Sequence, residues 1–228
     1  DDMKIGVLIT GDPPPELDGA GGYDQFFARL LGEDRFEYQA WRVLENEFPA
    51  STQDADGWLI TGSKHGAYED HSWIAPLEAF VRDVYSEGRP MIGVCFGHQI
   101  IAQALGGTVE KFDGGWSIGH TDYEIDGEPM SLNAWHQDQV TVRPDSAKNV
   151  GSSNFCENAA LLYGDHIWTI QPHPEFNADY IKGLIDIRSK GVVPPEIVAG
   201  ARSKLDQLDD GAKIGAFMAQ FFERERTK

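Results

Sequence analysis

A cysteine in the stretch GVCFGHQ (93–99) stands in a setting that favours nucleophilic chemistry. Cys95 lies between two glycines, directly after an apolar run and directly before a helical pattern. Gly93 and Gly97 let the backbone turn sharply and let helix and substrate approach closely. Such a turn exposes the sulfur, and the positive end of the helix dipole favours its thiolate form. The alternative is a small buried core cysteine, the usual role of a free cysteine.

A nucleophilic cysteine needs a base and a group that orients the base. The best candidate is His173 in QPHPEF, which follows the apolar run HIWTI at 166–170. In extended chain, residues two apart point the same way, so Glu175 shares a side with His173 and can orient its ring. The alternative is a surface loop, stiffened by prolines, whose histidine and glutamate are merely solvated.

The other histidines compete for the role of base. His136, in WHQDQ, has Asp138 two residues on and is a real competitor, whereas His98 is expected to pack below the turn at Cys95. Four more show no carboxylate pairing and are interpreted as solvated or structural: His65, His71, His120 and His166. No Cys/His cluster has the spacing of a zinc site, so no metal is expected. Cys156, in SSNFCENAA, is interpreted as structural.

The first half of the chain alternates strand and helix patterns. Strands are expected at 3–10, 36–43, 56–61 and 90–94, and helices at 23–31, 73–85 and 96–107. This alternation is typical of a parallel sheet with helices on both faces. Short, added antiparallel strands are expected around 108–112, 116–125, 138–143 and 159–170. Apolar stripes then predict helices around Ile181, Leu184 and Ile185, and around Ile214, Phe217, Met218, Phe221 and Phe222. We expect one α/β domain over 1–228, with a helical C-terminal tail from about 190.

Composition excludes several classes of partner. Asp and Glu outnumber Lys and Arg by 37 to 19, which gives a formal net charge of −18. Such a surface repels phosphate backbones and anionic lipid, so neither nucleic acid nor membrane is an expected partner. No apolar run reaches spanning length, and no signal-peptide pattern is seen. Two cysteines without an extracellular cue favour a reducing compartment, the cytoplasm. No GxGxxG or P-loop pattern supports a nucleotide cofactor.

Taken together, these segments resemble the class I (triad) glutamine amidotransferases. The resemblance rests on PMIGVCFGHQIIAQALGG, QPHPE and TGSKHGAY, and it extends over about residues 3–180. It implies an open, mostly parallel twisted sheet flanked by helices, of the flavodoxin-like type, with a few added antiparallel strands. The chain is similar to stand-alone members, both to the amidotransferase domains of GMP synthases and to the γ-glutamyl peptidases that cleave γ-glutamyl conjugates.

The resemblance also implies a role for each residue of the site. It makes Cys95 the nucleophile, His173 the general base and acid, and Glu175 the third member of a triad. The remaining implied contacts are an oxyanion hole from Gly62 or Ser63 with Phe96, and substrate contacts from Gln99 and from the Trp135–His136 pair of WHQD. His136 thereby becomes a supporting residue. The implied reaction is hydrolysis of the glutamine side-chain amide through a γ-glutamyl thioester, without a cofactor.

Two departures from the family pattern keep three functional hypotheses open. The family's usual Gly-Gly is Gly62-Ser63 here, and the tail is too short for an ATP-using synthase domain. The chain is therefore a glutaminase that supplies ammonia to a synthase subunit in trans, or a self-contained γ-glutamyl hydrolase. The third hypothesis is a non-catalytic binding or redox-sensing protein. A complete set of Cys95, His173 and Glu175 counts against it, because a redox sensor needs only the thiolate.

Overall fold

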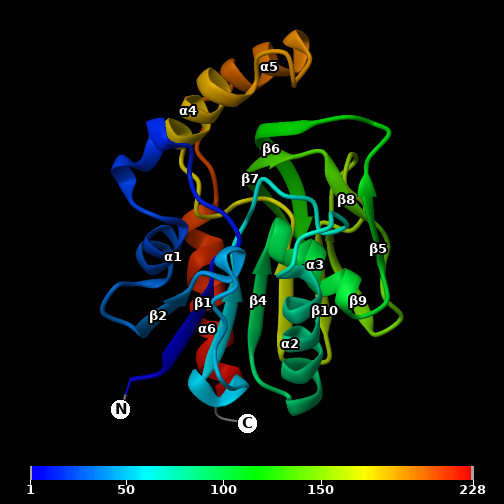
Figure 1. Cartoon of the computed structure of the whole chain (residues 1–228). Coiled ribbons are helices and arrows are strands. Elements are labelled where there is room, and N and C mark those ends of the chain that lie inside the picture. The colour runs from blue at the N-terminus through cyan, green and yellow to red at the C-terminus, as the bar shows by residue number, and fades with distance from the viewer. Residues whose placement is uncertain (1, 227–228) are drawn as a thin grey trace.

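A nine-stranded sheet runs through the part of the chain that the structure describes, and helices pack on both faces of it (Figure 1). The computed structural model describes residues 2–226. The strands are β1 (Lys4–Leu8), β2 (Glu37–Trp41), β3 (Gly57–Ile60), β4 (Met91–Val94), β5 (Thr108–Lys111), β6 (Ser117–Ile125), β7 (Glu128–His136), β8 (Asp138–Val142), β9 (Ala147–Ser152), β10 (Ala160–Tyr163) and β11 (Ile167–Ile170). Their order in the main sheet is β2-β1-β3-β4-β11-β10-β9-β6-β7, and β5 pairs with β8 separately.

Parallel and antiparallel strands divide the main sheet into two halves. Neighbours from β2 to β11 are parallel, whereas β10, β9, β6 and β7 continue the sheet with antiparallel pairs. This arrangement confirms the expected mostly parallel sheet with added antiparallel strands. The segment 159–170, expected as an antiparallel addition, instead divides into β10 and β11, and β11 pairs parallel with β4. Parallel strands end at one edge, and in open α/β sheets ligands bind beyond that edge.

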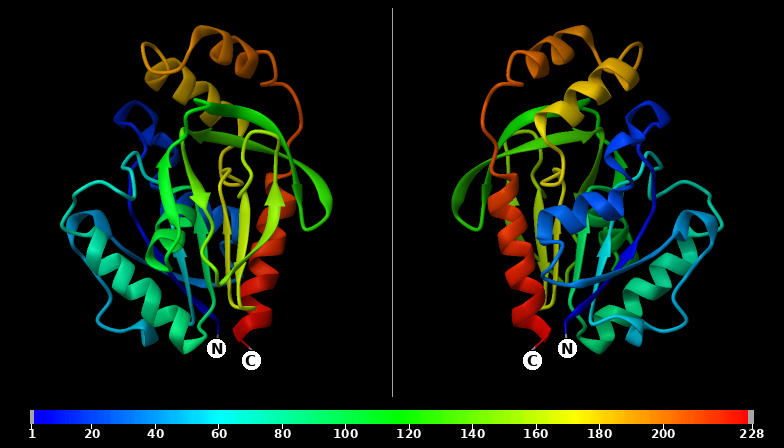
Figure 2. Two further views of the ribbon diagram at one scale, coloured as in Figure 1. Left: turned by 90° about the vertical axis from the view of Figure 1, so that its right-hand side faces the viewer. Right: turned by 90° about the vertical axis from the view of Figure 1, so that its left-hand side faces the viewer.

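The described helices are α1 (Tyr23–Leu31), α2 (Ile74–Glu87), α3 (Phe96–Ala104), α4 (Ala178–Arg188), α5 (Pro195–Arg202) and α6 (Gly211–Arg226), with short 3-10 turns at Pro15–Ala20, Val43–Glu45 and Thr52–Asp54. Of these, α1, α2, α3 and α6 cover the two faces of the sheet (Figure 2). Side chains of β1 alternate between two cores, as the strand period requires. Ile5 and Val7 belong to the core cluster that contains Phe222 of α6, whereas Leu8 belongs to the cluster that contains Leu77 of α2.

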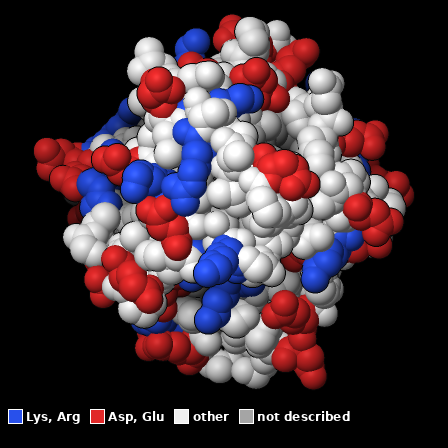
Figure 3. All heavy atoms as spheres, turned by 90° about the horizontal axis from the view of Figure 1, so that it is seen from above, with Lys and Arg blue, Asp and Glu red and all other residues white. Residues whose placement is uncertain are grey.

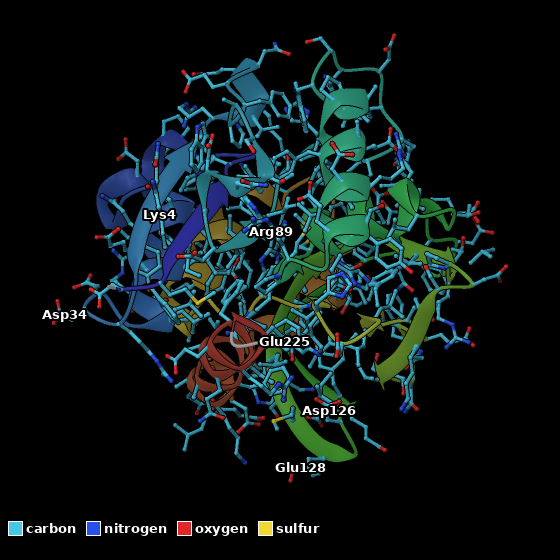
Figure 4. The ribbon with its side chains drawn as sticks, turned by 90° about the horizontal axis from the view of Figure 1, so that it is seen from below. Lys4, Asp34, Arg89, Asp126, Glu128 and Glu225 are labelled. Carbon is cyan, nitrogen blue, oxygen red and sulfur yellow. The ribbon has the colours of Figure 1, made fainter. Side chains whose placement is uncertain are left out.

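Two strands, β7 and β9, were not expected from the sequence. β7 pairs with β6 along its whole length, and the hairpin turns at Asp126 and Gly127, which both have positive φ (51° and 81°). An Asp-Gly pair between two apolar segments is a strong hairpin signal, so this turn could have been found from the sequence. Asp126 and Glu128 lie at the end of the molecule where the parallel strands begin, as the label of Lys4 at the start of β1 indicates (Figure 4).

Helices α4 and α5 lie above the edge at which the parallel strands end (Figure 1). Beneath them is a third apolar cluster, which includes Tyr23, Phe26, Phe176, Leu184 and Ala201. α5 packs closely on β6, since a Cβ atom on Gly119 would lie 3.0 Å from the Cβ of Ala201. Within residues 2–226, no helix is both long and apolar enough to cross a membrane.

Candidate active site

Cys95 occupies the junction between β4 and α3, in a backbone conformation that L-residues rarely adopt. Its φ is 54° and its ψ is −105°, and it caps the N-terminus of α3. Such a conformation typically costs about 1–3 kcal/mol, and it persists only where the surroundings impose it. The sequence placed the sharp turn on Gly93 and Gly97, but the turn is made by Cys95 itself. The glycines instead permit close packing: a Cβ on Gly97 would lie 2.3 Å from the carbonyl oxygen of Ile60.

The pairing of β4 with β11 brings the two predicted catalytic segments together. Val94 and Ile170 are partners at the ends of these strands, and the Cys95 N–H donates to the Ile170 carbonyl (2.9 Å). The next residue, Gln171, is fully buried and donates from Nε2 toward the Cys95 sulfur (3.4 Å). Gln99 in turn donates to the Gln171 side-chain oxygen (3.1 Å). Sequence reasoning missed Gln171, although it directly precedes the PHPE segment.

His173 and Glu175 form a buried pair beyond the end of β11. The ring Nδ1 lies 2.9 Å from Glu175 Oε2, and the two side chains are only 5% and 1% exposed. Phe176 stacks on the imidazole, with ring centres 4.0 Å apart and planes within 7°. Asn133 in β7 fixes this loop, because its carbonyl accepts from the His173 N–H (2.8 Å) and its side chain donates to the Phe176 carbonyl (2.9 Å). The expected pairing of His173 with Glu175 is therefore present in the structure.

The charges around His173 favour its protonated form. Burial opposes the imidazolium, but the interactions of the ring with Glu175 and with the sulfur of Cys95 outweigh it and raise the pKa of His173 to about 10. His136 behaves in the opposite way, because burial lowers its pKa to about 4. Its Nδ1 bonds the backbone carbonyl of Asp138 (3.0 Å) rather than a carboxylate. His136 therefore lacks the orienting carboxylate that a competing base would need.

His98 lies below the turn at Cys95, as the sequence predicted. It is fully buried on α3, and its Nδ1 lies 2.8 Å from the Thr169 hydroxyl of β11. Burial lowers the pKa of His98 to about 3, so the ring is neutral and serves packing between helix and sheet. Cys156 is a buried free thiol, and burial raises its pKa to about 12. Neither group is suited to nucleophilic or acid–base chemistry at neutral pH.

Gly62, just beyond β3, lies against both groups of the candidate pair. A Cβ atom added to it would be 3.0 Å from His173 Cε1 and 3.8 Å from Cys95 Cβ, so a larger residue would crowd the histidine. The Gly62 carbonyl accepts a hydrogen bond from the Thr10 hydroxyl (3.1 Å). Because C=O and N–H of a trans peptide point in opposite directions, the N–H of Ser63 points away from Thr10.

A second backbone donor near the sulfur is the N–H of Phe96. Phe96 is the first residue of α3, and the first N–H groups of a helix have no partner within the helix. The N-terminal end of the helix also carries the positive pole of its dipole, which favours negative charge on an adjacent atom. The Phe96 side chain is buried and packs against Trp73, so its backbone is the part available for a ligand.

A cavity of 410 Å³ opens over Cys95. It brings together seven of the nine residues singled out from the sequence: Gly62, Ser63, Cys95, Gln99, Trp135, His136 and His173. Glu175 contacts the His173 ring but does not line the cavity, and Phe96 is buried outside the lining. The Trp135 carbonyl is 3.9 Å from the Cys95 sulfur, at the end of β7. The size of this cavity is typical of small-molecule sites.

The outer part of the cavity is lined by residues that sequence reasoning did not identify. α4 and the segment after it contribute Leu184, Arg188 and Val192, and two lysines, Lys64 and Lys111, add positive charge. Arg188 makes no ion pair with any residue in the described part of the chain. The face seen from above carries Lys and Arg groups between acidic ones (Figure 3). Cationic groups are thus available to an anionic ligand despite the negative net charge.

His65 and His71, for which the sequence indicated no carboxylate partner, both lie near the carboxylate of Glu69. His71 Nε2 lies 2.9 Å from Glu69 Oε1, and His65 Nδ1 lies 3.6 Å from the same oxygen. The segment HGAYEDH places His65, Glu69 and His71 within seven residues, a signal that a search for Cys/His zinc spacing overlooks. The interpretation of these two histidines as unpaired is wrong. His166 also lies near a carboxylate, with Nδ1 3.8 Å from Asp165 Oδ1.

Comparison with known proteins identifies the family. The model of the glutamine amidotransferase class-I domain matches residues 20–181. The chain belongs to the class I glutamine amidotransferase family. This membership makes it a hydrolytic enzyme, since relatives named for both peptidase and amidotransferase activities share the domain.

Relatives of this amidotransferase-family chain fall into the two groups that the sequence suggested. It is 28% identical over 223 residues to gamma-glutamyl peptidase 2 of Arabidopsis thaliana, covering 91% of this chain and 90% of that protein. It is 30% identical over 185 residues to one subunit of the glutamine-hydrolyzing GMP synthase of Archaeoglobus fulgidus, covering 75% of this chain and 95% of that protein. A crystal structure of a glutamine amidotransferase from Methylobacillus flagellatus has the same fold, with a TM-score of 0.80 at 22% identity over 100% of this chain and 95% of the other.

We predict that the pKa of His173 lies above the usual value for histidine, whereas the pKa values of His98 and His136 lie below it. By NMR, the His173 ring should stay protonated from pH 6 to 9, whereas His98 and His136 should stay neutral down to about pH 5, as pKa values of about 10, 3 and 4 require. Glu175→Gln removes the nearby carboxylate and should lower the pKa of His173. Glu69→Gln is the matched control and should leave it unchanged. A wild-type His173 that titrates near 6.5 would contradict this electrostatic account.

Proposed function

We propose that this enzyme hydrolyses the γ-glutamyl amide bond of γ-glutamyl peptides, using Cys95 as nucleophile. The single observation that carries the proposal is the position of Cys95: a strained turn at a helix N-terminus, in one cavity with a histidine whose ring is bound to a buried glutamate. Nucleophile, base and orienting carboxylate are the three parts that cysteine-dependent acyl transfer requires. A protein that only binds or senses would need no buried His173–Glu175 pair.

The proposed reaction begins with an ion pair. The raised pKa of His173 favours an imidazolium beside a Cys95 thiolate. The sulfur attacks the γ-carbonyl carbon, the C–N bond breaks, and His173 gives its proton to the leaving amine. The γ-glutamyl group is then held as a thioester on Cys95. Water, deprotonated by His173, attacks this thioester and releases glutamate, which restores the thiolate and the imidazolium.

Backbone donors stabilise the oxygen that becomes negative during attack. We assign this role to the N–H groups of Ser63 and Phe96, which lie next to Gly62 and Cys95 respectively. Removal of one such donor typically costs about 3 kcal/mol of transition-state stabilisation. The Thr10–Gly62 hydrogen bond holds the first donor in place. Ser63 in place of the family's usual glycine leaves this donor intact, because the N–H belongs to the backbone.

The choice of a γ-glutamyl peptide over free glutamine rests on the outer cavity. The matched family domain ends at residue 181, whereas Leu184, Arg188 and Val192 line the cavity from beyond it. Glutamine has no group beyond its side-chain amide nitrogen. An outer part of the cavity with apolar and cationic walls therefore suits a larger substrate, in which that nitrogen carries a further residue. An unpaired Arg188 suits the carboxylate of a peptide, since Arg binds carboxylates through charge-assisted hydrogen bonds. The similarity to gamma-glutamyl peptidase 2 along nearly its whole length also supports this substrate class.

A glutaminase that delivers ammonia to a separate synthase subunit is the second candidate. It is supported by the similarity to the GMP synthase subunit from Archaeoglobus fulgidus, of which the chain covers 95%.

In either case we propose that residues 1–228 act as one domain, with α4 and α5 as part of the cavity wall. We also propose that the enzyme acts in a reducing compartment, the cytoplasm, because a free Cys95 thiol is needed for turnover.

The first test is glutamate release by the purified chain alone. Glutamine and a set of γ-glutamyl dipeptides are offered side by side, and we expect faster turnover of the dipeptides. Cys95→Ala and His173→Ala should each reduce turnover by at least about 1,000-fold, as loss of a triad member does. Cys156→Ala is the matched control and should retain activity. Turnover of glutamine but of no dipeptide would favour the second candidate, and near-normal activity of Cys95→Ala would overturn both.

The role of Arg188 gives a more specific prediction. Arg188→Ala should raise KM for a γ-glutamyl dipeptide by roughly 10-fold, the effect of losing one hydrogen bond to a charged group. Hydrolysis of glutamine, and of the same dipeptide with its C-terminal carboxylate amidated, should change little. Lys190→Ala is the matched control, because Lys190 is an exposed cation just past α4 that does not line the cavity. An equal rise in KM for all three substrates would show that Arg188 does not bind the C-terminal carboxylate of the dipeptide.

A further inference from the structure

Three side chains with metal-binding chemistry converge on the loop between β3 and α2. His65, Glu69 and His71 each offer one ligand atom, a ring nitrogen or a carboxylate oxygen, and these three atoms lie within 4.8 Å of one another. His65 and Glu69 also line the cavity that contains Cys95, so the cluster stands at the wall of the active site. Nothing in the proposed hydrolysis uses any of these three side chains.

Hydrogen bonds and ring contacts within the loop bring these side chains together. The Ser63 hydroxyl accepts from the His65 N–H (3.0 Å), and the Glu69 N–H donates to the Gly66 carbonyl (3.0 Å). The two imidazole rings lie 4.4 Å apart between centres, and the His71 ring stacks on Trp73, whose side chain is buried. A ligand set that is already assembled loses little conformational entropy on binding an ion.

The spacing of the ligand atoms suits a small transition-metal ion. Zinc–nitrogen bonds of 2.0–2.1 Å in a tetrahedron place ligand atoms about 3.4 Å apart. The His65–Glu69 pair is at 3.6 Å, and the His71–Glu69 pair, at 2.9 Å, is held by a hydrogen bond that a metal would replace. Two imidazoles and one carboxylate form a ligand set found in open zinc sites, which leave the fourth position to water or substrate.

We propose that His65, Glu69 and His71 bind one divalent transition-metal ion, of which zinc is the model, at the wall of the active-site cavity. Imidazole nitrogen favours such ions over Mg²⁺ and Ca²⁺, which prefer oxygen ligands. A bound ion keeps at least one open position and adds positive charge to a cavity wall. A carboxylate or thiol that enters the cavity is the kind of group that fills this position. Binding of the ion does not require the hydrolytic reaction.

The test measures zinc binding directly in a chain that lacks the active-site thiolate. Cys95 and His173 are themselves potential zinc ligands, so all variants carry Cys95→Ala. Isothermal titration with Zn²⁺ should show one equivalent bound, and millimolar Mg²⁺ should not compete. His65→Ala and His71→Ala should each weaken zinc binding at least about 10-fold. Loss of a residue that only orients a metal ligand already lowers metal affinity by about that factor, and these two residues are proposed as ligands themselves. Glu69→Gln, which keeps the side-chain shape but removes the charge, should also weaken it.

The matched control is His120→Ala. His120 is a partly exposed histidine of β6 whose Nε2 contacts the Leu208 carbonyl, and it lies outside the cluster and the cavity lining. Its removal should leave zinc affinity unchanged. Circular dichroism of each variant without metal checks that the fold is retained, and the Glu69→Gln variant covers the case in which a histidine variant fails to fold. Unchanged affinity after loss of either histidine, or no binding by the parent chain, would overturn the proposal whether or not the enzyme hydrolyses γ-glutamyl peptides.

Discussion

The parallel pairing of β4 with β11 is the interaction on which the site depends. It sets Val94 beside Ile170, so the chain leaves both strands at one point, with Cys95 on one side and Gln171 on the other. The Cys95 N–H bonds the last carbonyl of β11, which holds the cysteine in its strained conformation. A shift of this register by one residue would turn every side chain of β11 to the opposite face of the sheet and separate the two segments. The cores above and below the sheet therefore serve the chemistry by fixing this register.

A second constraint is the burial of charge beside the cysteine. An ion pair removed from water is stable only with good geometry and further hydrogen bonds. The stacking of Phe176 and the anchoring by Asn133 supply that geometry at His173. Glu175 Oε2 bonds the ring of His173, whereas its buried Oε1 finds no hydrogen-bond partner among residues 2–226, so the carboxyl group depends on His173 for its pairing. The same low-dielectric setting strengthens the attraction between His173 and the sulfur.

Much of this architecture could be predicted from the sequence, because its signals are local. The apolar runs of β1, β3 and β4, the glycines around Cys95, and the spacing of His173 and Glu175 each report on a few neighbouring residues. What could not be predicted depends on tertiary contacts. Asn133 lies in β7, far from His173 in the sequence, and the bridge between these two residues forms only through the fold. Arg188 enters the cavity because α4 folds over the strand ends. The contacts of His65 and His71 with Glu69 are local by contrast, and the spacing of HGAYEDH carried a signal for them.

The proposed hydrolysis requires that Cys95 carry the γ-glutamyl group during turnover. Acid quenching of the enzyme during steady-state hydrolysis of a γ-glutamyl dipeptide, followed by peptide mass spectrometry, measures this intermediate. We expect one γ-glutamyl group on the peptide that contains Cys95, removed by hydroxylamine as a thioester is, with none on Cys156. Two results together would contradict this intermediate. The wild-type enzyme would turn over rapidly with Cys95 unmodified at every quench time, and Cys95 would also stay unmodified in the His173→Ala variant, where hydrolysis of a thioester should be slowed.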